Sequence, residues 1–111
     1  MEDRYNGWRN YETWNLKLWI DNDQGLSEHW QEAAQTAFDD TDETDDTDTR
    51  KREAAEALAE QLESDTRENA PDVTGFYADA LGMAIGAVDY REIAESLLED
   101  LDTDGPDEAG R

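Results

Sequence analysis

Apolar residues recur at helical spacing in four or five separate stretches of the chain. The segment 10–22 (NYETWNLKLWIDN) opens on Asn10, a good N-cap residue, and predicts a helix of about three turns. Its apolar side chains divide between two faces, with Tyr11, Trp14 and Leu18 on one and Leu16, Trp19 and Ile20 on the other. Two apolar faces indicate a helix that is central or forms half of an interface.

A turn, a second helix and an acidic loop are predicted next. The stretch DNDQG supplies the turn, in which Gly25 suits a left-handed conformation. Ser27 then caps a helix that runs to about Phe38, and its buried side carries Trp30, Ala34, Ala37 and Phe38. The eleven residues 39–49 are only Asp, Glu and Thr, and seven of them are acidic. We predict a flexible, solvated loop there.

The segment from Arg50 to Ser64 gives the clearest helical pattern. It is rich in Ala, Leu, Glu and Gln, which are strong helix formers. A buried stripe repeats every four residues, formed by Ala54, Leu58 and Leu62. The opposite face carries a row of carboxylates, formed by Glu53, Glu56, Glu60 and Glu63.

A fourth helix is predicted after Pro71, from about Thr74 to Val88. Its buried stripe consists of Tyr77, Leu81, Ala84 and Val88. Gly82 and Gly86 lie on the other side of this helix, four residues apart. Because they have no side chains, we expect another backbone to approach closely there, with no space left for bulky neighbours.

A fifth helix opens at Asp89, which forms a capping-box variant with Glu92, and runs to about Leu101. Its inward residues are Tyr90, Ala94, Leu97 and Leu101, and its outward residues are Glu92, Glu95, Glu99 and Asp102. We therefore predict an all-α fold, a compact bundle of four to five short helices with an acidic loop. The single helical domain covers 1–101, and 102–111 form a disordered acidic tail.

Charge changes this picture from an ordinary bundle to a small core in an acidic shell. The chain has 31 acidic and 9 basic residues among 111, a formal net charge of -22, and only 16 Leu, Ile, Val and Phe residues. Four tryptophans supply much of the apolar surface. We expect Trp14 and Trp30 in the core, whereas Trp8 or Trp19 belongs to the core or to a partner-binding surface.

Several classes of chemistry are excluded or weakly supported. The chain has no cysteine, so disulfides, thiolate metal sites and cysteine nucleophiles are excluded. His29 is the single histidine, and its pairing with Glu32 at i, i+3 lacks the further carboxylates of helical metal sites. Two calcium-loop-like starts, near Asp21 and Asp102, lack the later ligands. We expect no enzyme, no cofactor and no metal site.

No secretory signal or membrane span is recognisable, so we expect a cytoplasmic location and no membrane partner. The negative charge also argues against direct nucleic-acid binding, because DNA would repel this surface. The expected partner is therefore a protein, and the oligomeric state is left open.

Two parts of the sequence resemble a family of small uncharacterised proteins from phages, plasmids and microbial genomes. The first is residues 7–15 (GWRNYETWN) with 18–26, and the second is 77–82 (YADALG) with 87–94 (AVDYREIA). The resemblance implies a shared domain of unknown function, often carried on mobile elements. It implies no catalytic residue.

The acidic surface admits two interpretations. Carboxylate rows on two helices, spaced about 5.4 Å per turn, can approximate phosphate rows, so the protein would act as a DNA mimic that inhibits a host defence enzyme or another DNA-binding enzyme. Alternatively, the charge is adaptation to high intracellular salt, as the two lysines against seven arginines suggest. In that case an accessory protein binds its partner through the Trp-rich N-terminal region. The mimic is the sharper hypothesis, and the two are compatible.

Overall fold

Five helices make up most of the computed structural model, which describes residues 4–101. They are α1 (Tyr11–Asn22), α2 (Gln24–Asp39), α3 (Thr47–Glu68), α4 (Gly75–Ala87) and α5 (Tyr90–Glu99). No strand of a sheet occurs among the described residues. The all-α prediction is confirmed.

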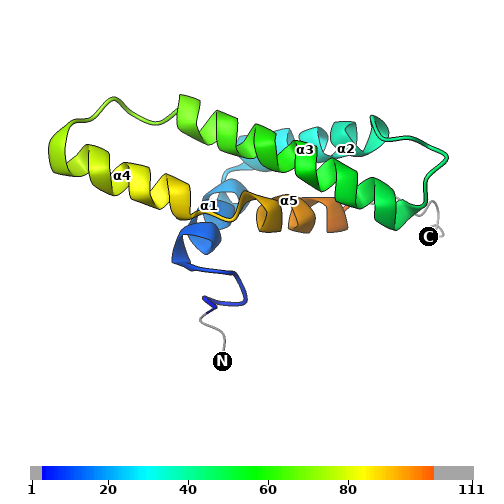
Figure 1. Cartoon of the computed structure of the whole chain (residues 1–111), viewed down its shortest axis with the longest axis horizontal. Coiled ribbons are helices and arrows are strands. Elements are labelled where there is room, and N and C mark those ends of the chain that lie inside the picture. Colours follow the sequence, from blue (N-terminus) through cyan, green and yellow to red (C-terminus); the bar gives the residue numbers. More distant parts are fainter. Residues whose placement is uncertain (1–3, 102–111) are drawn as a thin grey trace.

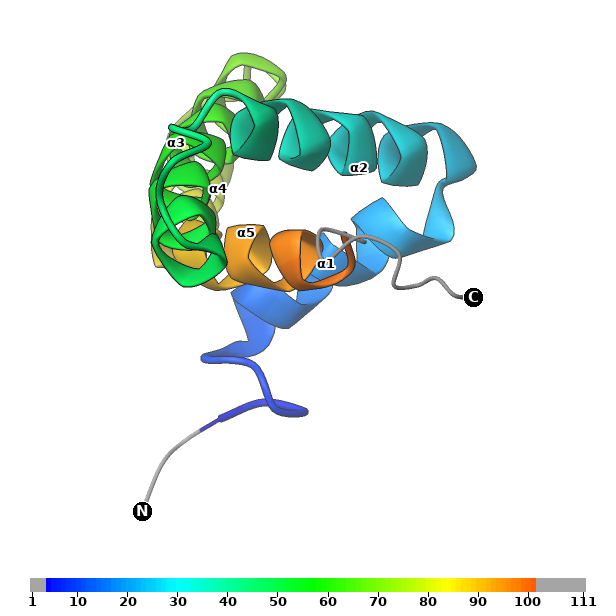
Figure 2. The same cartoon turned by 90° about the vertical axis from the view of Figure 1, so that its right-hand side faces the viewer.

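The longest helix, α3, organises the molecule. It packs most extensively on α5 and then on α2 (Figure 1). Viewed along the long axis, α2 and α5 lie on either side of the core and α3 closes it (Figure 2). α4 precedes α5 almost end to end and extends beyond the core, where its main contacts are with α1 (Figure 1).

The core is built by four of the five helices. Its buried apolar residues are Ile20, Trp30, Ala34, Phe38, Ala54, Ala55, Leu58, Leu62, Tyr90, Ile93, Ala94, Leu97 and Leu98. The predicted stripe on α3 is confirmed, as is the burial of Trp30 on α2. Leu101, expected inward on α5, lies past the helix end and is half-buried.

Four helices begin with a side chain that accepts a backbone N–H three residues ahead. Asn10, Asp23, Asp46 and Asp89 serve in this way for α1, α2, α3 and α5. Each cap satisfies one of the otherwise unpaired amides of the first turn. Thr74, which precedes α4, makes no such hydrogen bond.

The start of α2 differs from the prediction. Asp23 caps the helix instead of Ser27, so α2 begins at Gln24 and one residue separates it from α1. Gly25 consequently lies in the first turn and does not adopt a left-handed conformation. A Cβ at this position would stand 3.3 Å from the capping carboxylate of Asp23, so the missing side chain lets the cap form.

The acidic loop is shorter than the predicted 39–49. Asp39 still belongs to α2, and Asp46 caps α3, so α3 begins at Thr47 and not at Arg50. Arg50 fixes this corner, because its guanidinium stacks 4.1 Å from the centre of the Phe38 ring and donates to Thr41 Oγ1 at 2.8 Å.

The buried stripe predicted for α4 is wrong. Tyr77 is 70% exposed and no residue of α4 is buried, because the helix reaches beyond the core and lacks a neighbour on most sides. The close approach expected at Gly82 and Gly86 is also absent, since a Cβ built at either glycine meets no atom within 4 Å.

The buried face of α1 is mostly polar. It consists of Thr13, Lys17 and Ile20, so only Ile20 comes from the two apolar faces expected for this helix. Lys17 is buried because its ammonium donates to both carboxylate oxygens of Asp21, at 2.7 and 2.8 Å. Trp14, expected in the core, is half-buried and packs against Tyr5 and Tyr11 instead.

Candidate functional site

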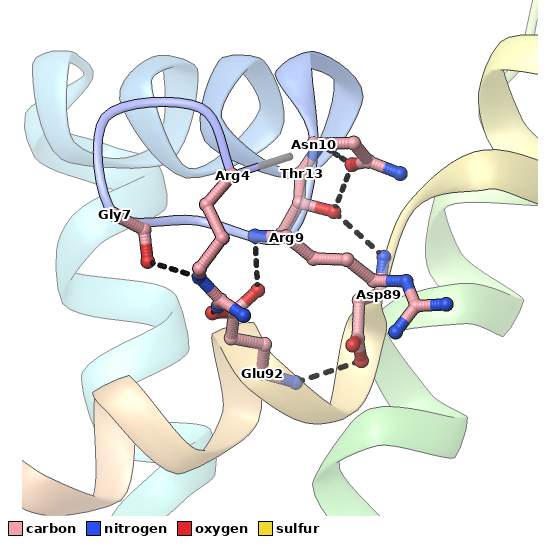
Figure 3. A network of polar contacts seen from close by, with 7 residues as sticks. All are labelled: Arg4, Gly7, Arg9, Asn10, Thr13, Asp89 and Glu92. Atoms are coloured by element: carbon pink, nitrogen blue, oxygen red, sulfur yellow. Dashed lines mark hydrogen bonds and ion pairs between the residues drawn. The ribbon is translucent and has the colours of Figure 1, made fainter. Parts of the chain in front are cut away.

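A network of hydrogen bonds joins the beginning of α1 to the junction between α4 and α5 (Figure 3). Asn10 accepts from the N–H of Thr13 at 2.9 Å and from its hydroxyl at 2.6 Å. The same Thr13 oxygen accepts the N–H of Asp89 at 2.8 Å, and Asn10 Nδ2 donates to the Ala87 carbonyl at 2.8 Å. We call this network the α1–α5 clasp.

Glu92 completes the clasp from α5. Its carboxylate accepts the backbone N–H of Arg9 at 2.9 Å and forms an ion pair with Arg4 (Figure 3). Arg4 is brought there by a tight turn in which Asn6 and Gly7 both have positive φ, the arrangement typical of an Asn-Gly hairpin turn. The Asp89 half of the predicted capping box is confirmed, since Asp89 accepts the Glu92 N–H at 3.1 Å. The Glu92 side chain, however, binds the N-terminal segment.

Several residues of the segments that carry the sequence resemblance have a structural role in the clasp. Asn10 and Thr13 belong to the first of the two resembling segments, and Asp89 and Glu92 belong to the second. The two segments therefore recognise each other across the fold. All four residues are used in holding the helices together.

Several large apolar side chains of α1 and α4 lie at the surface, and we call them together the apolar face. We define it by its large exposed or half-buried side chains, which are Tyr11, Trp19, Phe76, Tyr77, Leu81 and Met83. Phe76 and Met83 are 77% and 76% exposed, and Trp19 is 65% exposed. Single apolar side chains are normal on a surface, whereas contiguous exposed apolar patches are typical of interaction sites in proteins generally. Within this set the Phe76 and Tyr77 rings are in contact, and Tyr11, Trp19 and Leu81 line one groove.

A groove runs along the apolar face between α1 and α4. It has a volume of about 330 Å³ and is lined by Leu16 and Trp19 from α1 and by Leu81, Ala84 and Ile85 from α4. Three residues of the stripe predicted to be buried in α4, including Val88, line this groove. The periodicity therefore identified a real apolar stripe, of which Leu81, Ala84 and Val88 are half-buried beside α1.

The two tryptophans proposed for partner binding have different positions. Trp8 is half-buried and packs against the core. Trp19 belongs to the apolar face. The aromatic side chains of α4, Phe76 and Tyr77, were not predicted as site residues, although the nearly uncharged sequence of this helix was the available signal.

The acidic row on α3 is largely at the surface. Glu53, Glu56 and Glu60 are exposed, and no ion pair of the described residues involves them. Glu63 is half-buried and pairs with Arg67 at 3.0 Å.

The row on α5 is less uniform than predicted. Glu92 belongs to the clasp and its side chain is only 21% exposed, and Glu95 pairs with Arg91 at 3.2 Å. Glu99 is exposed, and Asp102 lies outside the described residues. Two of the four carboxylates proposed for this row are therefore held in contacts within the chain.

A polar groove of about 630 Å³ separates α3 from the α4–α5 junction. Its α3 wall carries Glu56, Glu60 and Glu63, and the rest of its lining includes Arg9, Arg91 and Asp89. The mixture of signs makes this groove less negative than the α3 row alone suggests.

Three ionisable groups have shifted pKa values for identifiable reasons. Burial raises the pKa of Tyr90, whose hydroxyl donates to the Ile85 carbonyl at 2.7 Å. Hydrogen bonds from the backbone and hydroxyl of Thr44 lower the pKa of Asp42, and those from the hydroxyl and backbone of Thr49 lower that of Asp46. Burial in the core therefore explains the shift of Tyr90, and hydrogen bonds within the loop and at the start of α3 explain those of Asp42 and Asp46.

Potential metal ligands and the single histidine are dispersed over the described residues. They contain no group of three or more His, Asp or Glu side chains arranged to hold a metal ion. His29 is exposed and packs edge-on against Trp30, with ring centroids 4.7 Å apart. Between residues 4 and 101, no helix combines the length and the apolar character needed to cross a bilayer.

Comparisons with known proteins yield one match. Neither a curated protein nor a solved structure matches the chain. A family model does match residues 1–102, which include all five helices and the clasp. The chain therefore belongs to DUF7249, a family of unknown function.

Proposed function

We propose that the chain is a non-catalytic protein-binding domain that associates with its partner through the apolar face. The exposure of α4 carries this proposal, because a helix with one charged residue in thirteen has no buried side chain. Leaving such a surface in water is unfavourable by about 25 cal/mol for each Å². A partner that covers it removes this cost.

The acidic remainder of the surface complements the apolar face. With a net charge of -22, molecules repel one another except where an apolar contact overcomes the repulsion. Neither lysine is exposed, since Lys17 is buried and Lys51 is half-buried. This pattern supports adaptation to high salt as the origin of the charge, and a contact made by apolar side chains remains effective at high salt.

The experiment is capture of partners from lysate on the immobilised full chain, at 0.1 M and 1 M NaCl. Met83→Glu places a charge on the apolar face, and Gln61→Glu adds the same charge at an exposed position of α3 as the matched control. A protein held by the parent and the control at both salt concentrations, and lost with Met83→Glu, supports the proposal. Equal capture by all three chains contradicts it.

DNA mimicry through the α3 row is the second candidate. Its support is the exposure of Glu53, Glu56 and Glu60 without cationic partners among the described residues. A basic DNA-binding groove attracts such a row as it attracts phosphates. A mobile-element origin, which the sequence resemblance implies, would fit an inhibitor of host defence.

The same capture experiment separates the second candidate from the first, because an electrostatic contact weakens at 1 M salt. Replacing Glu53, Glu56 and Glu60 by Gln removes three charges from the row, and replacing Glu28, Glu32 and Glu43 by Gln removes three exposed charges elsewhere. Mimicry predicts loss of the partner with the first triple variant alone, and competition by duplex DNA. Retention of the partner by the first variant contradicts mimicry.

A further inference from the structure

We propose that the partner of the apolar face is a second copy of this chain, which packs against it in a two-fold dimer with α4 at its centre. This inference rests on the proposed function and names the occupant of its binding surface. Three observations support it: the area of the apolar face, its charge, and the low intrinsic stability of α4.

The area of the apolar face matches what a stable dimer requires. Phe76, Tyr77, Met83 and Trp19 are each between 65% and 77% exposed, and Tyr11 is 50% exposed. Because a large side chain of this kind offers about 150–250 Å², the exposed fractions of these five side chains together correspond to roughly 500–800 Å². Specific complexes bury about 800 Å² per partner, so most of one side of an interface is already apolar.

The charge of the apolar face suits a second copy of an acidic chain. Asp79 is the single charged residue of α4, in a chain with a net charge of -22. α4 therefore contributes only Asp79 from each copy, and the α1 side of the groove adds Glu12, so apposing two apolar faces opposes few like charges for so acidic a chain. In a two-fold dimer the same surface of each copy contacts the other, so the apolar face of one copy would be covered by the apolar face of the second.

α4 is a weak helix on its own. It lacks a side-chain cap, has Gly82 and Gly86 in its interior, and makes its main contacts with one helix, α1. Isolated helices of this length are marginal in water, and interior glycine lowers helix propensity further. Packing against a second α4 supplies the contacts that the monomer lacks.

Two polar segments of the chain have sequences unsuited to this role. Residues 102–111 contain only Pro106 and Ala109 as apolar residues, so the C-terminal segment is too polar to cover the face. The acidic loop between α2 and α3 contains no apolar residue. A second copy, in contrast, carries the required aromatic side chains.

The test is the mass of the purified full chain in solution, measured by sedimentation velocity from 1 to 100 µM at 0.1 M and 1 M NaCl. We expect twice the chain mass of 12.6 kDa, with the dimer favoured as salt screens the repulsion. Met83→Glu should return the mass to that of one chain, whereas Gln61→Glu should stay dimeric.

A second variant distinguishes loss of the dimer from loss of folding. Phe76→Glu places its charge in the first turn of α4, where the helix dipole favours it, and Phe76 is 77% exposed. Monomeric mass with unchanged far-ultraviolet circular dichroism in this variant supports the dimer. A parent that stays monomeric at 100 µM in 1 M NaCl overturns it, as does a dimer that both variants retain. If the parent is monomeric but captures another protein in a Met83-dependent manner, the dimer is wrong and the proposed function stands.

Discussion

Replacing Thr13 by Val tests whether the α1–α5 clasp holds the fold together. The two side chains have nearly the same shape, so the substitution removes a hydroxyl while leaving packing almost unchanged. Thr13 is fully buried, and its hydroxyl both donates to Asn10 and accepts from the N–H of Asp89. Valine can do neither.

The expected cost follows from these two hydrogen bonds. The Asp89 N–H is left without its acceptor, which costs about 1–3 kcal/mol for a group away from water. Asn10 keeps the Thr13 N–H as a donor, so the cap of α1 is weakened but not lost. We expect Thr13→Val to lower the free energy of unfolding by about 2–3 kcal/mol, a large share of the ~5–15 kcal/mol typical of a domain.

The measurement is urea unfolding followed by circular dichroism in constant 1 M NaCl, which keeps the screening of the acidic surface unchanged. With a urea dependence of about 1–3 kcal/mol per M, the midpoint should fall by roughly 1–2 M. Thr13→Ser is the control, because it keeps the hydroxyl and loses one methyl group, worth about 1 kcal/mol. A Thr13→Val variant with the parent midpoint, or one more stable than Thr13→Ser, would refute the role assigned to the clasp.

Three further outcomes can be measured by unfolding. In the Met83→Glu background, where the proposed dimer is absent, Leu58→Ala at a fully buried position should cost about 2–5 kcal/mol, and Leu81→Ala on the half-buried groove wall about 1 kcal/mol or less. Equal costs in urea unfolding would contradict the difference in burial between the two stripes. Burial raises the pKa of Tyr90, so the native state holds this proton more tightly than the unfolded state, and the stability that results is present below about pH 10 and lost as the pH rises further. In alkaline unfolding Tyr90→Phe should lose less stability than the parent over that range, and an equal loss would argue against Tyr90. The melting temperature should rise between 0.1 M and 1 M NaCl as self-repulsion is screened, and an unchanged value would show that repulsion is unimportant.

The helices were predictable wherever one apolar stripe faces the core. Ala54, Leu58 and Leu62 on α3 and Tyr90, Ala94 and Leu97 on α5 lie where their periodicity places them. Helix ends were less predictable where two capping residues compete. Asp23 precedes Ser27 and accepts the N–H of Leu26 in the first turn of α2, and Asp46 likewise starts α3 inside the segment assigned to the loop.

Burial could not be predicted from periodicity on α1 and α4. On α1 the position toward the core belongs to Thr13 and Lys17, whose polar groups are satisfied by Asn10 and Asp21. A hydrophobicity pattern does not register such pairs. On α4 the stripe is present but only α1 packs beside it, so its residues are half-buried or exposed, and sequence periodicity cannot distinguish a stripe that meets the core from one at the surface.

The candidate site was predictable in part. Trp19 was named from the aromatic pattern of α1, and Glu53, Glu56 and Glu60 from the acidic row of α3, and all four are at the surface. Glu92 also fits an acidic row by spacing. Its carboxylate is instead engaged by Arg4 and the Arg9 amide, more than 80 residues away in the chain. Contacts between such distant segments leave no periodic signal.

The clasp also determines when this protein can finish folding during its synthesis. α2 and α3 are neighbours in the chain and can pair early, since a short loop costs little entropy to close. Thr13, in contrast, must wait for Asp89, 76 residues later, before its hydroxyl meets the backbone amide. α1 can pack on α2 early, but its N-terminal end is secured only once α5 has been made, so a nascent chain that stops before α5 lacks the clasp.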